Sequence, residues 1–296
     1  MEPEHFQPLV SVIIPTYNRA ELLPDAIESV MQQTYPEFEV IVVDDGSTDD
    51  TAAIMSQWSD RITYIRREIN EGRSAVVNLA VNIAQGNFIA ILDSDDVWLP
   101  HKLKRQVEVF KHFPECGAVG GGAMYMDLSG RPFGKAMIPS EIIEYKKFAV
   151  SMCLPGSHSN EIMRREAFEK VGGLDVALRR AQDYDFWLKL IRQYPIRAVP
   201  EVLMYKRAHQ GKRPYADIET IVKCRKLIAS RIPEPELRRK HLAWMWFQVA
   251  RKSFASGRVA NGSKFVARSF FTYPFLISTK HRRLKRLFWL IEEKVL

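Results

Sequence analysis

The chain has 296 residues, of which 46% are hydrophobic and 26% charged, a balance that excludes disordered and collagen-like chains. The formal net charge of +8 is unevenly divided along the sequence. Residues 1–210 carry 23 Lys and Arg against 29 Asp and Glu, whereas residues 211–296 carry 20 against 6. We therefore expect two domains, an acidic one over residues 1–212 and a basic helical segment over residues 213–296.

The cysteines and the hydropathy pattern indicate a cellular compartment. Cys116, Cys153 and Cys224 form no CxxC pair, which argues against a disulfide framework or a cysteine zinc site and favours a reducing compartment. The N-terminus has no secretory signal, and no apolar run approaches the ~20 residues of a membrane helix. We predict a cytoplasmic protein, either soluble or peripheral on the inner face of the cell membrane.

Strands and helices are expected to alternate in the first part of the chain. Apolar runs predict strands at 9–14, 40–43, 62–65 and 88–92, and helical spacing predicts helices at 22–33, 51–58, 74–84 and 100–113. This alternation is typical of an α/β fold with a Rossmann-like, mostly parallel sheet flanked by helices.

The pattern is less regular after Pro114. We expect a strand at 118–126, a loop over 131–144, helices at 166–171 and 184–194, and an edge strand at 202–205. Four further helices are predicted at 218–230, 235–256, 260–271 and 282–294.

Three polar clusters follow predicted strands, at 15–19, 44–47 and 93–96. Ligands of open α/β sheets bind at the carboxyl ends of the strands, so the clusters predict one shared crevice.

Asp93 and Asp95 are two residues apart, and in an extended segment they would offer oxygen ligands on one side to Mg²⁺ or Mn²⁺. The alternative is an Asp-rich turn or a helix cap.

The other two clusters each allow two interpretations. Asp44 or Asp45 could accept hydrogen bonds from a nucleobase or ribose, while Ser47 or Thr48 could cap the following helix. Tyr17 could stack on a base or belong to the core.

Two further segments carry candidate site residues. Gly72 and Arg73 open a predicted helix and could bind a diphosphate, or could simply form a turn. Asp183 could be a general base or a helix cap, and Trp187 could wall a sugar pocket or lie in the core. His209 follows a predicted strand, and by itself it suggests a surface loop residue.

Together these motifs resemble family 2 glycosyltransferases of the GT-A fold. The resemblance rests on Val12–Arg19 (VIIPTYNR), Val42–Asp49 (VVDDGSTD), Asn70–Gly72 and Ala90–Asp96 (AILDSDD), followed by Arg164–Asp175 and Asp183–Leu188. The motifs occur in the family's order and cover about residues 8–210.

The resemblance implies an inverting transfer from a nucleotide-diphosphate sugar, assisted by Mn²⁺ or Mg²⁺. We expect the sugar to be linked to UDP. It implies Asp183 as general base, although Gln182 stands where the family usually has Glu. It implies metal binding by Asp95 and His209, and nucleotide-sugar binding by Pro15, Thr16, Tyr17, Arg19, Asp44, Asp45, Gly72, Arg73, Asp93, Ser94 and Trp187.

The expected acceptor is a glycan or a lipid-linked saccharide. The alternatives are a sugar-nucleotide pyrophosphorylase, which is disfavoured because residues 15–19 lack glycine, and a catalytically silent nucleotide-sugar-binding or membrane-scaffold protein. Basic and aromatic residues interleave over 265–290, which suits an anionic membrane surface or a solvated helix. No nucleic-acid partner is expected, because no DNA- or RNA-binding module is visible.

Overall fold

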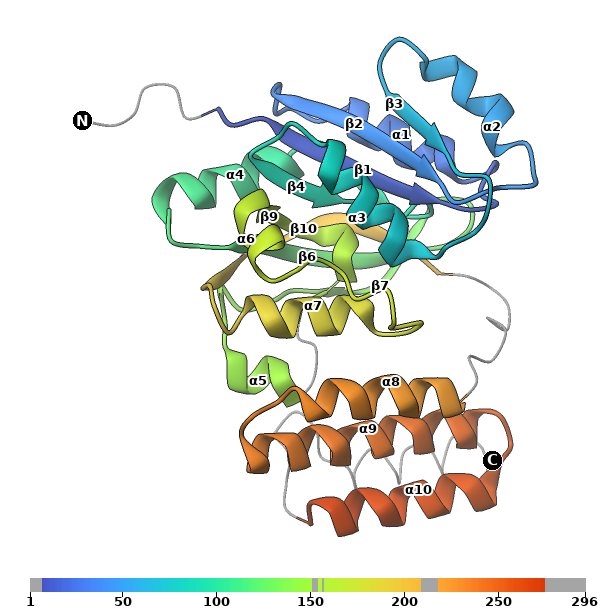
Figure 1. Cartoon of the computed structure of the whole chain (residues 1–296), viewed down its shortest axis with the longest axis vertical. Helices are drawn as coiled ribbons and strands as arrows, with labels where there is room; N and C mark the ends of the chain where they lie inside the picture. The colour runs from blue at the N-terminus through green and yellow to red at the C-terminus, as the bar shows by residue number, and fades with distance from the viewer. Residues whose placement is uncertain (1–6, 151–153, 156, 209–217, 275–296) are drawn as a thin grey trace. The chain divides into compact units, whose positions relative to one another are not determined.

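The computed structural model describes residues 7–150, 154–155, 157–208 and 218–274 (Figure 1). The chain divides into two compact units. The first comprises residues 1–144, 153–178 and 182–212, and the second comprises residues 145–152, 179–181 and 213–296. Two short segments of the acidic part of the sequence thus group with the C-terminal helices.

The first unit is built on a ten-stranded sheet with the order β3-β2-β1-β4-β9-β6-β10-β5, in which β7 also pairs with β6 and β8 with β10. The strands are β1 Val10–Thr16, β2 Phe38–Asp44, β3 Thr63–Arg66, β4 Phe88–Ile91, β5 Val97–Trp98, β6 Ala118–Met126, β7 Pro132–Met137, β8 Ile142–Ile143, β9 Ile162–Arg164 and β10 Ile196–Arg207. Strands β3, β2, β1 and β4 are parallel, with Val12 opposite both Val40 and Ala90. Strand β9 runs antiparallel to β4 and β6, so the sheet is mixed.

The helices of this unit bury one face each. They are α1 Leu23–Met31, α2 Thr51–Ile54, the 3₁₀ helix η1 Met55–Trp58, α3 Arg73–Ile83, α4 Lys102–His112, the 3₁₀ helix η2 Ser157–Asn160, α6 Arg165–Lys170 and α7 Gln182–Leu190. In α1, Pro24 occupies the first turn, and Leu23, Ile27 and Val30 are buried. The buried residues of α1, η1 and α4 join residues of β1, β2 and β4 in one core.

Two expectations about the second half of the sheet were wrong. The predicted loop over 131–144 contains β7 and β8; five of the six residues of β7 are exposed, so this strand lacks the apolar alternation that identifies one. The predicted edge strand at 202–205 is part of the longer β10, which lies between β6 and β5. Its first half was missed because the register shifts after Val199, where Pro200 and Glu201 interrupt the pattern.

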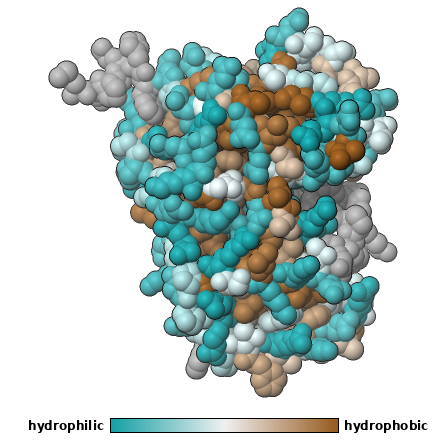
Figure 2. Space-filling model, in the orientation of Figure 1, coloured by the Kyte–Doolittle hydropathy of each residue, from teal (hydrophilic) through white to brown (hydrophobic). Residues whose placement is uncertain are grey.

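The second unit consists of α5 Tyr145–Val150, α8 Ile218–Ser230, α9 Pro235–Ala255 and α10 Val259–Thr272. Trp246 of α9 stacks on Phe265 of α10 at 5.6 Å between ring centroids. Within the described part of the chain, no helix is both long and apolar enough to cross a membrane. The predicted helix at 282–294 lies outside the described residues. Hydrophilic residues cover much of the face drawn in Figure 2, with apolar residues exposed between them.

Candidate functional site

The polar segments after β1 and β2 are joined by hydrogen bonds. Asn18 adopts a positive φ of 51°, and its backbone N–H donates to Ser47 Oγ at 2.8 Å. Its side-chain Oδ1 accepts the backbone N–H of Thr48, also at 2.8 Å. Because β1 and β2 are adjacent and parallel, their ends lie side by side, and Asn18 connects the two loops.

Asp44, at the end of β2, is fully buried and bonded within the protein. One carboxylate oxygen accepts the backbone N–H of Ser47 at 2.8 Å, and the other accepts the hydroxyl of Tyr64 at 2.8 Å. These contacts make Asp44 a support for the loop that carries Asp45.

Asp45 joins this loop to the start of α3. Its two carboxylate oxygens accept the backbone N–H groups of Glu71 at 2.9 Å and Gly72 at 2.8 Å. Burial raises the pKa of Asp45, and the hydrogen bond from Gly72 opposes that increase. Gly72 has a φ of +94°, a conformation that favours glycine, and the next residue, Arg73, begins α3.

Arg73 points to the first aspartate of the sequence Asp93–Asp96. Its Nε and Nη2 donate to Asp93 Oδ1 at 3.0 and 2.7 Å, and the Asp93 backbone N–H donates to Ser159 Oγ. Burial acts to raise the pKa of Asp93, but the positive charges of Arg73 and Lys206 outweigh it and lower the pKa to about 2. Asp93 is therefore a carboxylate at neutral pH.

Asp95 and Asp96 are held against the end of β10 by Arg207. Its side chain donates to the Asp95 carbonyl oxygen and its backbone N–H donates to Asp96 Oδ1, both at 3.0 Å. The Asp95 carboxylate lies 3.9 Å from the guanidinium of Arg19. Burial raises the pKa of Asp96 to about 7; Lys206 opposes the increase, while Asp93 and Asp95 add to it.

Lys206 is the most informative residue that sequence analysis missed. Burial acts to lower its pKa, but four carboxylates outweigh that effect and raise it, so the side chain is a cation. The four carboxylates are those of Asp96, Asp93, Asp183 and Asp95. The structure thus brings Asp183 into the same charged cluster as the aspartates that follow β4. The sequence did carry a signal for it, because Lys206 and Arg207 are two consecutive cations directly after the strand predicted over 202–205.

Asp183 lies in the first turn of α7, where its Oδ1 accepts the backbone N–H of Tyr184 at 2.8 Å. His158 interacts electrostatically with Asp183 and is fully buried, and within the described part of the chain neither of its ring nitrogens has a hydrogen-bond partner. Burial and the nearby Arg73 lower the pKa of His158 to about 3, so its ring is neutral. No spacing pattern in the sequence distinguished His158.

Trp187 does not provide an open wall for a sugar. It is fully buried, and its ring lies 5.5 Å from His158 and 5.3 Å from Phe186. Trp187 therefore packs against His158, which in turn interacts with Asp183 and Asp93 of the charged cluster.

The remaining predicted residues differ in exposure. Pro15, Thr16 and Ser94 are buried, whereas Tyr17 is 43% exposed and is available to a ligand. His209 lies outside the described residues.

The donor set fits a divalent metal only in part. Among the residues that the structure describes, no group of three His, Cys, Asp or Glu side chains is arranged to hold a metal ion. The available atoms are hard oxygen donors, and one of them, Asp96 Oδ2, is buried. Such a set suits Mg²⁺ or Mn²⁺ whose coordination is completed by the oxygens of a diphosphate.

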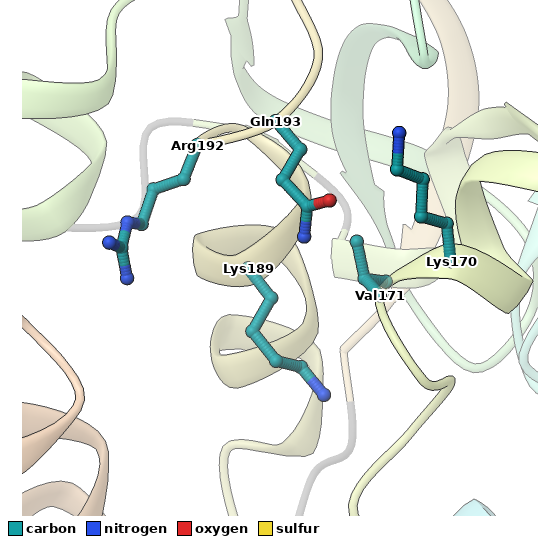
Figure 3. A pocket seen from close by; sticks show the side chains of 5 residues that line it. All are labelled: Lys170, Val171, Lys189, Arg192 and Gln193. Atoms are coloured by element: carbon teal, nitrogen blue, oxygen red, sulfur yellow. The ribbon is translucent and has the colours of Figure 1, made fainter.

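A separate hollow of about 290 Å³ lies at the C-terminal end of α7, the opposite end from Asp183 (Figure 3). It is lined by Lys170, Val171, Lys189, Arg192 and Gln193. The three cationic side chains point in different directions in Figure 3, so they do not form a convergent anion site.

The fold is that of GT-A glycosyltransferases, as comparison with solved structures shows. S. aureus TarS in complex with UDP-GlcNAc matches 89% of this chain and 81% of its own, with a TM-score of 0.69 and 21% identity. The mannosyltransferase PcManGT from Pyrobaculum calidifontis, in complex with GDP-Man and Mn²⁺, matches 100% of this chain and 82% of its own, with a TM-score of 0.60 and 18% identity.

The chain belongs to glycosyl transferase family 2, whose family model matches residues 11–172, and it is an enzyme of the glycosyltransferase type. An uncharacterized glycosyltransferase of Rickettsia prowazekii is 32% identical over 72% of this chain and 68% of its own. The putative teichuronic acid biosynthesis glycosyltransferase TuaG of Bacillus subtilis is 35% identical over 64% of this chain and 74% of its own. The expected fold and family are thus confirmed.

Some relatives are much longer. The match covers 36% and 35% of two proteins from Rickettsia conorii and Rickettsia felis.

Proposed function

We propose that the protein transfers a sugar from a nucleotide-diphosphate sugar to a saccharide acceptor with inversion at the anomeric carbon. One observation carries the proposal: Asp183 shares a charged cluster with Asp93, Asp95 and Lys206. A base and a diphosphate site must lie together for direct displacement, because the acceptor oxygen attacks as the diphosphate leaves. The nucleotide sugars in the TarS and PcManGT complexes support this class of donor.

The nucleoside would lie over the ends of β1 and β2. Tyr17 is exposed there and can stack on a base, a contact worth about 1–3 kcal/mol in nucleic-acid complexes. Asp45 is fixed by two backbone N–H groups, and its free lone pairs can accept hydrogen bonds from the base or ribose.

The diphosphate would lie among the cations. Lys206 and Arg19 are both beside Asp95, and their charges would compensate the charge that develops on the leaving group. Arg73 holds Asp93 in its ionised form beside them. Asp183 would accept the proton of the attacking acceptor hydroxyl.

We propose that Asp95 binds Mn²⁺ or Mg²⁺, with His209 as a second candidate ligand. The bound metal would neutralise charge on the diphosphate. The Mn²⁺ in the PcManGT complex supports this assignment.

The proposed acceptor is a growing glycan or lipid-linked saccharide, which the name of TuaG supports.

We also propose peripheral binding to an anionic cytoplasmic membrane surface through the basic 265–290 segment. Its described part includes Arg268 and the 88% exposed Phe271. Co-sedimentation with phosphatidylglycerol vesicles tests this, and Phe271→Ser and Arg268→Gln should both weaken it. Equal binding by phosphatidylcholine vesicles would contradict it.

The donor proposal is tested with a thermal-shift panel of UDP-, GDP- and dTDP-sugars, each with Mn²⁺ and with EDTA. A matching nucleotide sugar should raise the Tm of the wild-type protein, and Mn²⁺ should increase that shift. Asp95→Asn should reduce the Mn²⁺-dependent part, whereas the exposed Asp60→Asn should match wild type. A protein that no nucleotide sugar stabilises, and that hydrolyses none of them, would contradict the proposal.

A further inference from the structure

Two aromatic rings are exposed side by side on the β6–β7 hairpin of the first unit. Tyr125 of β6 and Phe133 of β7 are direct cross-strand partners. Their ring centroids lie 6.1 Å apart with an angle of 25° between the planes, and the residues are 40% and 46% exposed. Rings of this size are ordinarily buried, so a stacked pair left in contact with solvent forms an apolar surface suited to a ligand.

The strand register connects this pair to the charged cluster. In the parallel pairing of β6 with β10, Tyr125 lies opposite Lys206. Partners in register point to the same face of a sheet, and Lys206 faces the carboxylates of Asp95 and Asp183. Lys206, Tyr125 and Phe133 therefore form a row across three neighbouring strands on one face. Two strand spacings, roughly 10 Å, separate the ends of this row.

The chemistry of the row changes along its length. At the Lys206 end it is charged, as a diphosphate requires. At the other end it has two nearly parallel aromatic faces and one phenolic hydroxyl. Asp127 of the adjoining turn is occupied, because its carboxylate accepts the backbone N–H groups of Ser129 and Arg131. A neutral pyranose matches this end, since one face of the ring presents C–H groups and its rim presents hydroxyls that the tyrosine can bond.

We propose that Tyr125 and Phe133 form a stacking platform for a neutral pyranose ring of the acceptor saccharide. The platform would position the acceptor hydroxyl toward Asp183. This inference rests on the proposed function, because it assumes that the charged end of the row holds the donor. The nucleobase has its own candidate platform, Tyr17, at the end of β1.

The test uses full-length protein and saturation-transfer difference NMR with methyl glycosides of glucose, galactose, mannose and N-acetylglucosamine, in the presence of UDP and Mn²⁺. The methyl group avoids an aromatic aglycone that would itself stack. At least one glycoside should receive saturation from the wild-type protein. Tyr125→Ala and Phe133→Ala should weaken that binding by about tenfold, and Tyr125→Phe should restore most of it.

The matched control is Ile142→Ala. Ile142 is 60% exposed and pairs with Arg197 at the opposite end of β10, so its loss should leave glycoside binding unchanged. UDP affinity, measured by calorimetry, should equal that of wild type in all four variants. Failure of wild type to bind any of UDP, GDP and dTDP would contradict the proposed function instead, and binding of GDP or dTDP alone would move the test to that nucleotide.

Three results would overturn the platform itself: no glycoside bound by a wild-type protein that binds UDP, binding unchanged in both alanine variants, or a concentration-dependent dimer that both alanine variants abolish. The last result would assign this face to a second copy of the chain.

Discussion

Arg73 donates two hydrogen bonds to one carboxylate oxygen of Asp93, at 3.0 and 2.7 Å, and so couples the start of α3 to the residue that follows β4. The pair is part of the proposed donor site, and it keeps Asp93 charged at a half-buried position.

Arg73→Met should raise the pKa of Asp93, because burial then acts on that carboxyl without its main counter-charge. In wild type the pKa lies at about 2, below the ordinary 3.8, so this group's contribution to stability is complete above about pH 4 and is lost as the pH falls toward 2. The variant should therefore be less stable than wild type above pH 4, and its stability should fall less as the pH drops below 4. Urea denaturation from pH 3 to 7, with carboxyl ¹³C NMR, measures both effects. An unchanged Asp93 titration would contradict the coupling.

Asp183→Asn should lower kcat by about 10²–10⁴-fold, the usual contribution of a general base. The affinity for nucleotide should not change, because the amide keeps the size and the Oδ1 acceptor that bonds to Tyr184. Single-turnover transfer and nucleotide calorimetry separate the two quantities. The control is Asp60→Asn, at an exposed position in the turn before β3. Normal turnover in Asp183→Asn would remove the assignment.

Asp45→Asn should destabilise the protein by about 1–3 kcal/mol, because the amide NH₂ would face a backbone N–H that the carboxylate now bonds. Asp45 is only 3% exposed, so these two bonds to backbone N–H groups are largely shielded from water. Urea denaturation measures the change, with the exposed Asp50→Asn as control. Equal stability of the two variants would mean that the turn is held by other contacts.

Lys206→Met should bind Mn²⁺ more tightly than wild type when nucleotide is absent, because the ammonium competes with the metal for the same carboxylates. The same variant should bind UDP more weakly in EDTA, where Lys206 supplies charge compensation. Electron paramagnetic resonance of free Mn²⁺ and calorimetry measure the two affinities. Lys206→Arg should resemble wild type, as should Lys104→Met on the exposed side of α4. A decrease in Mn²⁺ affinity would show that Lys206 organises the cluster and does not compete with the metal.

Lys102→Met should stabilise the protein near neutral pH. Lys102 is fully buried, donates to Gln106 Oε1 at 2.7 Å and lies 3.9 Å above the Trp98 ring. Burial lowers its pKa from 10.5 to about 7, with Glu161 opposing the decrease. The unfolded chain therefore binds more protons between these values, and wild-type stability should rise with pH from about 7 to 10.5. The variant should lack this slope, and Lys104→Met should keep it. Parallel pH profiles in all three proteins would contradict the effect.

The parallel half of the sheet could be predicted because β1, β2 and β4 are buried on both faces and appear as unbroken apolar runs. The polar residues after them could be predicted for the same reason, since the ends of parallel strands meet at one edge. Strand β7 could not, because its exposed residues carry no hydrophobic period. His158 could not be assigned, because only the fold of η2 places it beside Asp183, whereas Lys206 left a signal in the two consecutive cations that follow the predicted strand at 202–205.

The hydrogen bonds of Asn18 and Asp45 have a consequence for ligand binding. They tie three loops that are distant in sequence into one network before any nucleotide arrives. The conformational entropy of ordering these loops is then lost during folding, so little remains to be lost on binding. Backbone amides such as those of Thr48 and Gly72 should consequently exchange slowly with solvent even in the ligand-free enzyme, and nucleotide should change their exchange rates only slightly.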